Sequence, residues 1–386
     1  MVRPNLLREL SEQEVLDEIF RGGPITRPQI AGATKLSKAT VGAAIERLEL
    51  AGIIRTVGQQ HGRRGRSPVA YEIRGNAGFV LGVDIGGTNI RVAAADIFGA
   101  PIGDEHVLTS HDGARAVSAQ VLEIAGHVVE RARATHERLL AAAVSTPGIV
   151  DQVTRRVTSL AYNVSPDGGL DPLAALRARF DVPVQIENNV NLAALGESWE
   201  GLARNVETFA FVSIGAGVGM GLVVGGELVR GAHGGAGEIG YLPSGRDPYD
   251  ERHRLRGGLE DEIGAAGILA ALRERSGRDL EFVHEVFTLA RDRDEAARAV
   301  VQAVAQRLGV AIASVIAVID PQLIVLGGGI GSNPALLGPV RATVAELVPL
   351  TARIEISRLG DQAALHGAIA VALREAHALL FTRATR

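Results

Sequence analysis

The chain has 386 residues, with 40 lysine and arginine side chains against 44 aspartate and glutamate, and a net charge of −4 at pH 7. This length is too great for one compact core and indicates two or three domains. The hydrophobic share of 46% and the charged share of 22% are those of a globular protein. Because the sequence has no cysteine, it excludes disulfides, thiol nucleophiles and cysteine-ligated metal centres.

The positive charge is concentrated near the N-terminus. Residues 21–74 hold ten basic side chains and three acidic ones, a local charge of +7, which leaves −11 for the rest of the chain. A basic module joined to an acidic body indicates a local polyanion-binding region. An ordinary solvated basic surface is the alternative that composition leaves open.

Neither a secretion signal nor a membrane span is expected. The first ten residues, MVRPNLLREL, lack an apolar segment and a small-residue cleavage site. The longest uncharged stretch, 321–340, holds five glycines and three prolines, which suits a strand followed by a loop. We therefore predict a cytoplasmic protein with no membrane partner.

Helical patterns occupy the first 52 residues. Ser11 and Glu14 predict a capping box at the start of a first helix, and the glycines and proline at 22–24 end it. A second helix is expected over 26–33 and a third over 38–51, capped by Ser37. The third helix would bury Val41, Ile45, Leu48 and Leu50. Two short helices and a longer third are the helix-turn-helix arrangement.

A wing is predicted to follow these helices. Two β-branched segments, 53–57 and 69–73, flank a glycine- and arginine-rich stretch at 59–68. The exposed start of the third helix can enter a major groove, and the wing arginines can reach phosphates or a narrow minor groove. The predicted DNA-binding residues are Ser37, Lys38, Thr40, Arg63, Arg64 and Arg66. A winged helix that binds protein instead of DNA is the alternative.

Three glycine-rich turns follow strand-like segments in the body. The first is Asp84-x-Gly86-Gly87-Thr88, which can present backbone N–H groups and a hydroxyl to phosphate. It lacks the lysine of a P-loop, and a tight hairpin without function would use the same glycines. The second and third turns carry Gly215 with Gly217 and Gly327 with Gly328. Together the three are the pattern of a two-lobed actin-like ATPase around a nucleotide cleft.

Two further segments complete a family likeness: Glu187-Asn188-Asn189 and Gly237-Glu238-Ile239-Gly240-Tyr241. With them, residues 79 to about 375 resemble the ROK family (repressors, open reading frames and sugar kinases), and the N-terminal module resembles that of ROK transcriptional repressors. The resemblance implies an α/β chain: a winged helix-turn-helix domain over 1–75, a small lobe over 76–192 plus about 375–386, and a large lobe over 193–374.

The resemblance also implies that catalysis has been lost. ROK kinases use an aspartate as general base directly after the asparagine that Asn188 matches, and here Asn189 stands in its place. An amide cannot accept a proton at neutral pH, so a base contribution of about 10²–10⁴-fold is missing. Ala216 replaces the usual threonine of the second phosphate loop. We predict no enzyme, no cofactor and a vestigial nucleotide site formed by Asp84, Gly86, Gly87, Thr88, Gly215, Gly217, Gly327 and Gly328.

The zinc site of the family is also predicted to be absent. Tyr241 takes the position of its histidine, and Glu251, His253 and Gly258 take those of its three cysteines. These four residues do not make a zinc tetrahedron. Weak metal binding by Glu251 and His253 is the alternative.

Sugar contacts are implied for five positions, because carboxylates and amides suit a polyol. They are Asn188, Asn189, Glu238, Tyr241 and Glu260. The alternative is that Glu238 and Asn189 only stabilise turns and do not contact a sugar.

The sequence thus predicts a DNA-binding regulator of carbohydrate metabolism, most simply a repressor, with a sugar effector and a palindromic operator read by a homodimer or tetramer. A sugar kinase that carries a DNA-binding domain is one alternative. A degenerate body that only oligomerises is the other.

Overall fold

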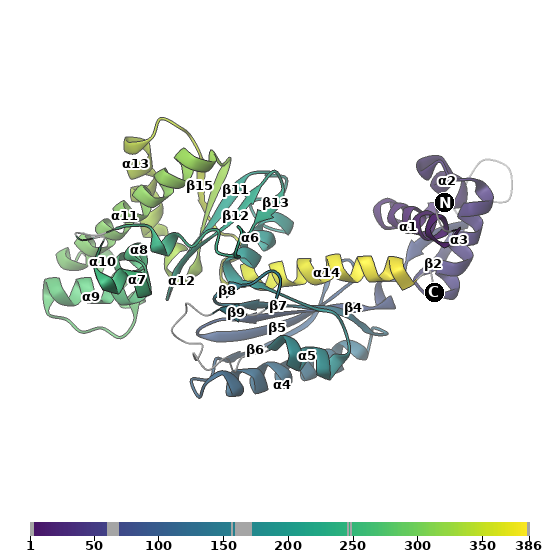
Figure 1. The fold of residues 1–386 in the computed structure, drawn as a ribbon, viewed down its shortest axis with the longest axis horizontal. Coiled ribbons are helices and arrows are strands. Elements are labelled where there is room, and N and C mark those ends of the chain that lie inside the picture. The colour runs from purple at the N-terminus through teal and green to yellow at the C-terminus, as the bar shows by residue number, and fades with distance from the viewer. Residues whose placement is uncertain are drawn as a thin grey trace.

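The computed structural model describes residues 4–59, 69–155, 157–158, 172–244, 247 and 249–383. The molecule is elongated, with an N-terminal module at one end and two larger lobes beyond it (Figure 1). Each lobe is built on a five-stranded sheet, and the module has a three-stranded sheet of its own. This is the three-part α/β architecture that the sequence predicts.

The N-terminal module packs three helices around one core that includes the fully buried Val15, Ile30 and Ile45. Its strands pair in the order β1-β3-β2, so the hairpin of the predicted wing is present. The elements are α1 (Pro4–Gly22), β1 (Ile25–Thr26), α2 (Arg27–Thr34), α3 (Lys38–Leu50), β2 (Ile54–Gln59) and β3 (Val69–Ile73).

Two predictions for this module are wrong. The first helix begins at Pro4, and Ser11 lies inside it. The cause is the run of leucine, arginine and glutamate at 6–10, which are strong helix formers, while proline is tolerated in a first turn. Leu50, predicted to be buried, is 90% exposed. Val41, Ile45 and Leu48 follow the helical repeat of one face and are buried, and Leu50 lies off that face.

The small lobe has the strand order β10-β7-β4-β5-β6. Its central strands β4 and β7 are buried along their whole length because helices cover both faces of the sheet. Helices α4 and α5 cover one face, and α6 and α14 cover the other (Figure 1). The elements are η1 (Gly75–Ala77), β4 (Phe79–Ile85), β5 (Asn89–Asp96), β6 (Pro101–Leu108), α4 (Ala114–Arg133), β7 (Leu139–Thr146), β8 (Ile149–Val150), β9 (Val157–Thr158), α5 (Pro172–Phe180), β10 (Val184–Asn188), α6 (Asn189–Trp199) and α14 (Ala363–Arg383).

The large lobe has the strand order β13-β12-β11-β14-β15. One face of this sheet packs on a helical layer centred on α11, and the other packs on α6. The elements are β11 (Phe209–Ile214), β12 (Val218–Val224), β13 (Glu227–Val229), η2 (Ile239–Tyr241), α7 (Glu251–Arg256), α8 (Gly258–Ile263), α9 (Ala265–Ser276), α10 (Val283–Arg291), α11 (Glu295–Ile319), β14 (Leu323–Gly327), α12 (Gly328–Gly331), α13 (Pro334–Leu347), β15 (Arg353–Ile356) and η3 (Gly360–Gln362).

Helices α6 and α14 cross in close backbone contact. A Cβ on Gly367 would lie 1.8 Å from the carbonyl oxygen of Leu192, and one on Gly196 would lie 2.2 Å from that of Ala363, so only glycine fits at either position. Because α6 leads to β11 and α14 follows β15, the crossing joins both connections between the lobes. The predicted lobe boundary at about residue 375 falls inside α14, so we propose to place it near Ala363.

The N-terminal module is packed directly against the small lobe. Phe20 of α1 stacks on Phe98 with ring centroids 5.3 Å apart, and it meets the ring of His377 of α14 edge-on at 4.6 Å. Nε2 of His377 donates to the carbonyl oxygen of Ile97 at 2.8 Å. Figure 1 shows α14 running from the lobes to the module. The module and the small lobe therefore share one hydrophobic core.

Among the described residues, two segments are long and apolar enough to cross a membrane by length and composition: α11 and residues 360–380. About 50% of the apolar window of each is buried inside the protein. α11 packs on α10 and α13, and residues 360–380 belong largely to α14, which covers the small-lobe sheet. Both segments therefore form part of the cores of the lobes.

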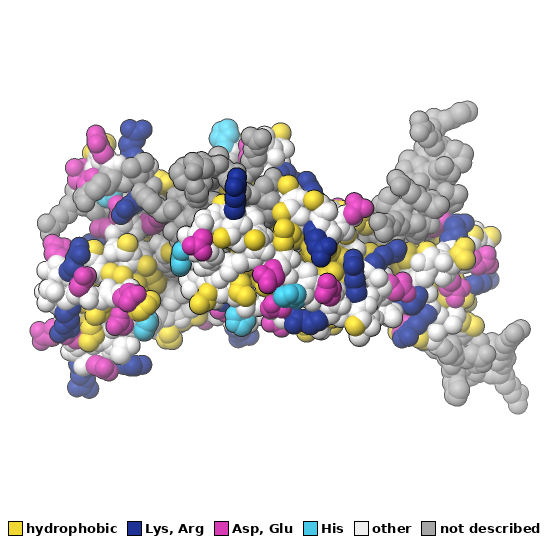
Figure 2. All heavy atoms as spheres, turned by 90° about the horizontal axis from the view of Figure 1, so that it is seen from below, with side chains coloured by type: hydrophobic (Ala, Val, Ile, Leu, Met, Phe, Trp, Pro, Cys, Tyr) yellow, Lys and Arg dark blue, Asp and Glu magenta, His cyan; other side chains and the backbone are white. Residues whose placement is uncertain are grey.

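Charged side chains of both signs are intermixed on the face of the body that Figure 2 shows. The acidic excess of the body is therefore not gathered into one patch on this face. A mixture of both signs creates no strong single-sign field over the part of this face that is described.

Candidate functional site

The start of α3 is exposed, as a DNA-reading helix requires. The hydroxyl of Ser37 accepts a hydrogen bond from the backbone N–H of Thr40 at 3.1 Å and so caps the helix. Ser37 and Lys38 are exposed and Thr40 is half-buried. The three wing arginines Arg63, Arg64 and Arg66 lie outside the described residues.

The first glycine turn joins β4 to β5. The N–H of Gly86 donates to the carbonyl oxygen of Asn89 at 2.9 Å, and a Cβ on Gly86 would lie 2.8 Å from that oxygen. Gly87 and Thr88 are exposed at the tip. Asp84 is buried behind it and accepts from the Ser145 hydroxyl at 2.6 Å. Burial raises the pKa of Asp84 to about 6, against the lowering effects of Ser145 and the Arg91 charge.

The second and third turns lie side by side on the large lobe. β11 and β14 are parallel, with Ser213 opposite Gly327, so both strands end at the same edge of the sheet. Gly328 has φ +78°, and a Cβ there would lie 2.4 Å from the carbonyl oxygen of Ile214. Gly215 and Gly217 close the β11–β12 hairpin with an N–H to carbonyl bond of 2.9 Å.

Arg91 contacts both the strand before the first glycine turn and η3, the segment that leads from the large lobe into α14. Its guanidinium lies 3.9 Å from the carboxylate of Asp84 and forms an ion pair with Asp361 of η3. η3 in turn contacts α12, which begins at Gly328. The predicted nucleotide residues of the two lobes are therefore linked through one arginine.

Asn188 and Asn189 lie where β10 meets α6. The side-chain oxygen of Asn188 accepts from the N–H groups of Val190 and Asn191 at 2.8 and 3.1 Å, and its amide donates to the carbonyl oxygen of Gly148 at 3.0 Å. Asn188 thus caps α6 and retains one amide hydrogen for another partner. Asn189 is the first residue of α6 and is half-buried.

The two predicted sugar-binding glutamates lie on or beside elements that contact β12: Glu260 on α8, and Glu238 just before η2. Glu260 of α8 accepts from the backbone N–H of Val218 at 2.8 Å. Glu238 directly precedes η2, which ends at Tyr241. Burial raises the pKa of both carboxyls, and the negative charge of Glu260 further raises the pKa of Glu238. Both carboxyls therefore lie in surroundings that disfavour their ionised form.

Two contacts connect the start of α6, where Asn188 and Asn189 lie, to the part of the large lobe that carries the two glutamates. Val190 of α6 packs on β12, 3.3 Å from a Cβ built on Gly219. The buried carboxylate of Glu187 pairs with Arg230 at 2.5 Å, on the segment that leads from β13 toward Glu238. The other oxygen of Glu187 accepts from the N–H of Asn188 at 2.9 Å and from the Asn191 amide at 3.1 Å.

The positions that carry zinc in the family lie around η2 and α7. Glu251 begins α7, and Nε2 of His253 lies 3.9 Å from a carboxylate oxygen of Asp261. Gly258 begins α8, and Tyr241 ends η2, which both α7 and α8 contact. Within the described ranges, no group of three or more His, Asp or Glu side chains could hold a metal ion. The prediction that the chain binds no metal stays a prediction.

Sequence reasoning missed Glu187, Arg230, Arg91 and Asp361. A buried acid at the end of a strand requires a partner, so Glu187 could have been singled out. Its partner Arg230 lies 43 residues away, and Asp361 lies 270 residues from Arg91. No local pattern identifies either pair.

A winged helix-turn-helix packed on the small lobe of a two-lobed body, with glycine-rich turns on both lobes, defines a class: DNA-binding modules fused to sugar-kinase-like bodies. The chain belongs to the ROK family, whose sequence model matches residues 80–375. Residues 8–55 match the model for winged helix-turn-helix DNA-binding domains. The predicted family and fold class are confirmed.

Individual relatives include both regulators and kinases. The chain is 26% identical to a putative xylose repressor of Caldicellulosiruptor sp. (strain Rt8B.4), over 96% of this chain and 97% of that protein. It is 29% identical to a glucokinase of Halalkalibacterium halodurans, over 74% of this chain and 92% of that protein. The crystal structure of a ROK family transcriptional regulator, a homolog of the E. coli MLC protein, shares the fold with TM-score 0.79 at 23% identity, over 98% of this chain and 99% of that one.

Proposed function

We propose that this chain is a transcriptional repressor of carbohydrate metabolism that binds operator DNA and releases it in response to a sugar. The observation that carries the proposal is the shared core of the winged helix and the small lobe, which makes the DNA-binding module a continuation of the body. The likeness to a named repressor over nearly the whole chain supports it.

The sugar would bind to residues of both lobes. Glu238, Glu260 and Tyr241 belong to the large lobe, and Asn188 and Asn189 to the start of α6. A ligand held by both halves favours one arrangement of the lobes and shifts the population toward it. Helix α14 would transmit this shift, since it crosses α6 at Gly367 and contacts the module at His377.

The body would bind the sugar without phosphorylating it. Asn189 lacks a basic group and Ala216 lacks a hydroxyl, so the eight nucleotide-site residues are proposed to be vestigial. A coupled phosphorylation assay over hexoses, pentoses and amino sugars tests this. Turnover comparable to that of ordinary sugar kinases would favour the alternative, a kinase that carries a DNA-binding domain.

The assembly would be a homodimer or tetramer in the cytoplasm that reads a palindromic operator. Two copies of α3 related by a two-fold axis match two half-sites of opposite orientation. An operator-release titration with a sugar panel tests the function as a whole. Release by at least one sugar is expected, and operator affinity that no sugar changes would contradict sugar sensing.

The wing arginines are expected to supply phosphate contacts. In the triple variant Arg63→Ala, Arg64→Ala, Arg66→Ala, operator affinity should fall and the slope of log K against log salt should decrease by up to about 2.7, at about 0.9 per phosphate lost. Fluorescence anisotropy at several salt concentrations measures both quantities. The matched control removes three exposed arginines from the large lobe: Arg273, Arg291 and Arg298. Equal affinity of the two triple variants would refute the wing assignment.

The Phe20 contact is expected to couple the module to the body. Phe20→Ala removes the stack on Phe98 and the edge contact with His377. Sugar affinity should be unchanged, while the effect of sugar on operator affinity, about 5–150-fold in typical coupled proteins, should fall toward 1. Phe282→Ala on the large lobe, at a residue that is 53% exposed, is the control. A full sugar response in Phe20→Ala would exclude this route of transmission.

A further inference from the structure

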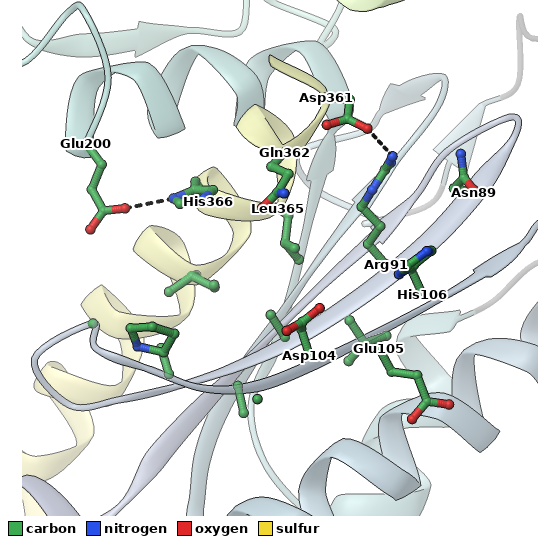
Figure 3. A pocket seen from close by; sticks show the side chains of 18 of the residues that line it. Asn89, Arg91, Asp104, Glu105, His106, Glu200, Asp361, Gln362, Leu365 and His366 are labelled. Atoms are coloured by element: carbon green, nitrogen blue, oxygen red, sulfur yellow. Dashed lines mark hydrogen bonds and ion pairs between the residues drawn. The ribbon is translucent and has the colours of Figure 1, made fainter. Parts of the chain in front are cut away.

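A cavity of about 500 Å³ lies on the α14-facing side of the small-lobe sheet (Figure 3), and neither Glu238 nor Glu260 is among the residues that line it. Its floor is formed by Ala93 and Ala95 of β5 and by Asp104 and His106 of β6. Ala93 pairs with Asp104 in the sheet, so their side chains point to the same face. The volume falls within the range of about 300–1,000 Å³ that small-molecule sites occupy.

The cavity exists because the helical layer is narrower than the sheet. α14 contacts β4 and β7 along much of its length, contacts β5 less, and leaves the edge strand β6 open. The walls come from the two connections between the lobes: the end of α6, η3 and the first turns of α14. The wall residues are Trp199, Glu200, Asp361, Gln362, Leu365 and His366.

Several polar groups of the cavity already hold one another in place. Nδ1 of His366 bonds to Glu200 at 2.7 Å, and Arg91 pairs with Asp361 (Figure 3). The carboxylate of Glu105 lies on the opposite face of the sheet, where it pairs with Arg131 and His127 of α4. The amides of Asn89 and Gln362 supply further donors and acceptors.

The charge of the lining disfavours an anion. Asp104, Glu200 and Asp361 contribute three carboxylates. The single guanidinium, Arg91, already faces Asp361 and Asp84. A phosphate or carboxylate ligand would meet a net negative surface with no free arginine, and would lose its hydration without compensation.

We propose that this cavity binds an uncharged polyol of monosaccharide or disaccharide size, at a second site distinct from Glu238 and Glu260. The half-buried indole of Trp199, backed by the buried Leu365 and Ala93, offers an apolar surface to the C–H face of a sugar ring. Amides, imidazole and carboxylates at the rim suit its hydroxyls. Because its walls are the two lobe connections, an occupant of this cavity biases the same lobe arrangement as the first site.

Trp199 makes the proposal directly testable, since it is the only tryptophan of the chain. Tryptophan emission of the full chain is titrated with glucose, xylose, maltose and sucrose, and with glucose 6-phosphate as the anionic probe. Two variants separate the sites: Glu238→Gln for the first site, and Asp104→Ala with Gln362→Ala for the cavity. Asp104 and Gln362 are both exposed, so the cavity variant should fold.

The expected result is a saturable change of emission with at least one neutral probe. This change persists in Glu238→Gln and weakens at least about tenfold in the cavity variant, and glucose 6-phosphate binds more weakly than glucose. No saturable change with any neutral probe would overturn the proposal. So would a change that disappears in Glu238→Gln and survives in the cavity variant, because it would report the first site alone. Phosphate-ester binding as tight as that of glucose would overturn the assigned ligand class.

This test is independent of the proposed function, because emission is measured without DNA. Operator release that fails while the emission change persists contradicts sugar-responsive repression and leaves the cavity site standing. The reverse pattern contradicts the cavity site alone.

Discussion

Replacing Glu187 with alanine is expected to lower the free energy of unfolding by about 3 kcal/mol. The Glu187 side chain is 7% exposed and its Arg230 partner is 31% exposed, and breaking a buried ion pair from one side costs about 3–5 kcal/mol. The lower end of that range applies because Arg230 keeps some contact with water. The variant also leaves the N–H of Asn188 and the amide of Asn191 without their acceptor.

Urea unfolding of Glu187→Ala and of the control Glu137→Ala measures this effect. Glu137 pairs with Arg74 at 2.7 Å, but its side chain is 46% exposed, so its loss should cost less than about 1 kcal/mol. Equal costs for the two variants would show that the Glu187 pair adds no more than a surface ion pair. Sugar affinity should fall only in Glu187→Ala, since Glu187 orients the start of α6 against the segment that carries Glu238.

Replacing Glu238 with glutamine is expected to weaken sugar binding by about 10–100-fold. A hydrogen bond to a charged acceptor contributes about 1.5–3 kcal/mol, and the amide retains only part of this. Half-release of the operator should require a correspondingly higher sugar concentration. Calorimetry and the operator-release titration measure the two effects, with Glu227→Gln, at the exposed first residue of β13, as the control.

The pH dependence of sugar binding has a definite sign. Burial and the charge of Glu260 raise the pKa of Glu238 above its ordinary value. The ionised carboxylate is the form that accepts hydroxyl donors, so affinity should fall as the pH is lowered through this raised pKa. The decline should begin at a higher pH than for an ordinary glutamate, and Glu238→Gln should reduce it. A pH-independent affinity in the native chain would contradict the assigned role of Glu238.

Local patterns predicted the parts of the site that depend on backbone geometry. Gly86 and Gly328 stand where a Cβ would collide with a carbonyl oxygen, and glycine-rich turns after apolar strands are visible in any sequence. Ser37 was recognisable as a cap because capping depends on residues three positions apart. The prediction that Leu50 is buried was wrong, because an apolar residue next to the buried face of a helix cannot be told from the residues of that face by its type.

Long-range pairs were beyond such patterns. Glu187 with Arg230 and Arg91 with Asp361 unite different lobes, and which acid meets which base depends on how the sheets are placed. The cavity at Trp199 likewise results from a helical layer that covers β5 only in part and leaves β6 open. None of its lining residues forms a sequence motif.

By itself, then, the sequence determined the winged helix, the glycine turns and the family, because each depends on residue type at short spacing. Only the tertiary structure decided that the module shares a core with the small lobe, that Glu187 pairs α6 with the segment leading to Glu238, and that a cavity lies against the lobe connections. These features are contacts between residues far apart in the chain. Burial of apolar surface drives such contacts, but it is non-directional and leaves no pattern at short spacing in the sequence.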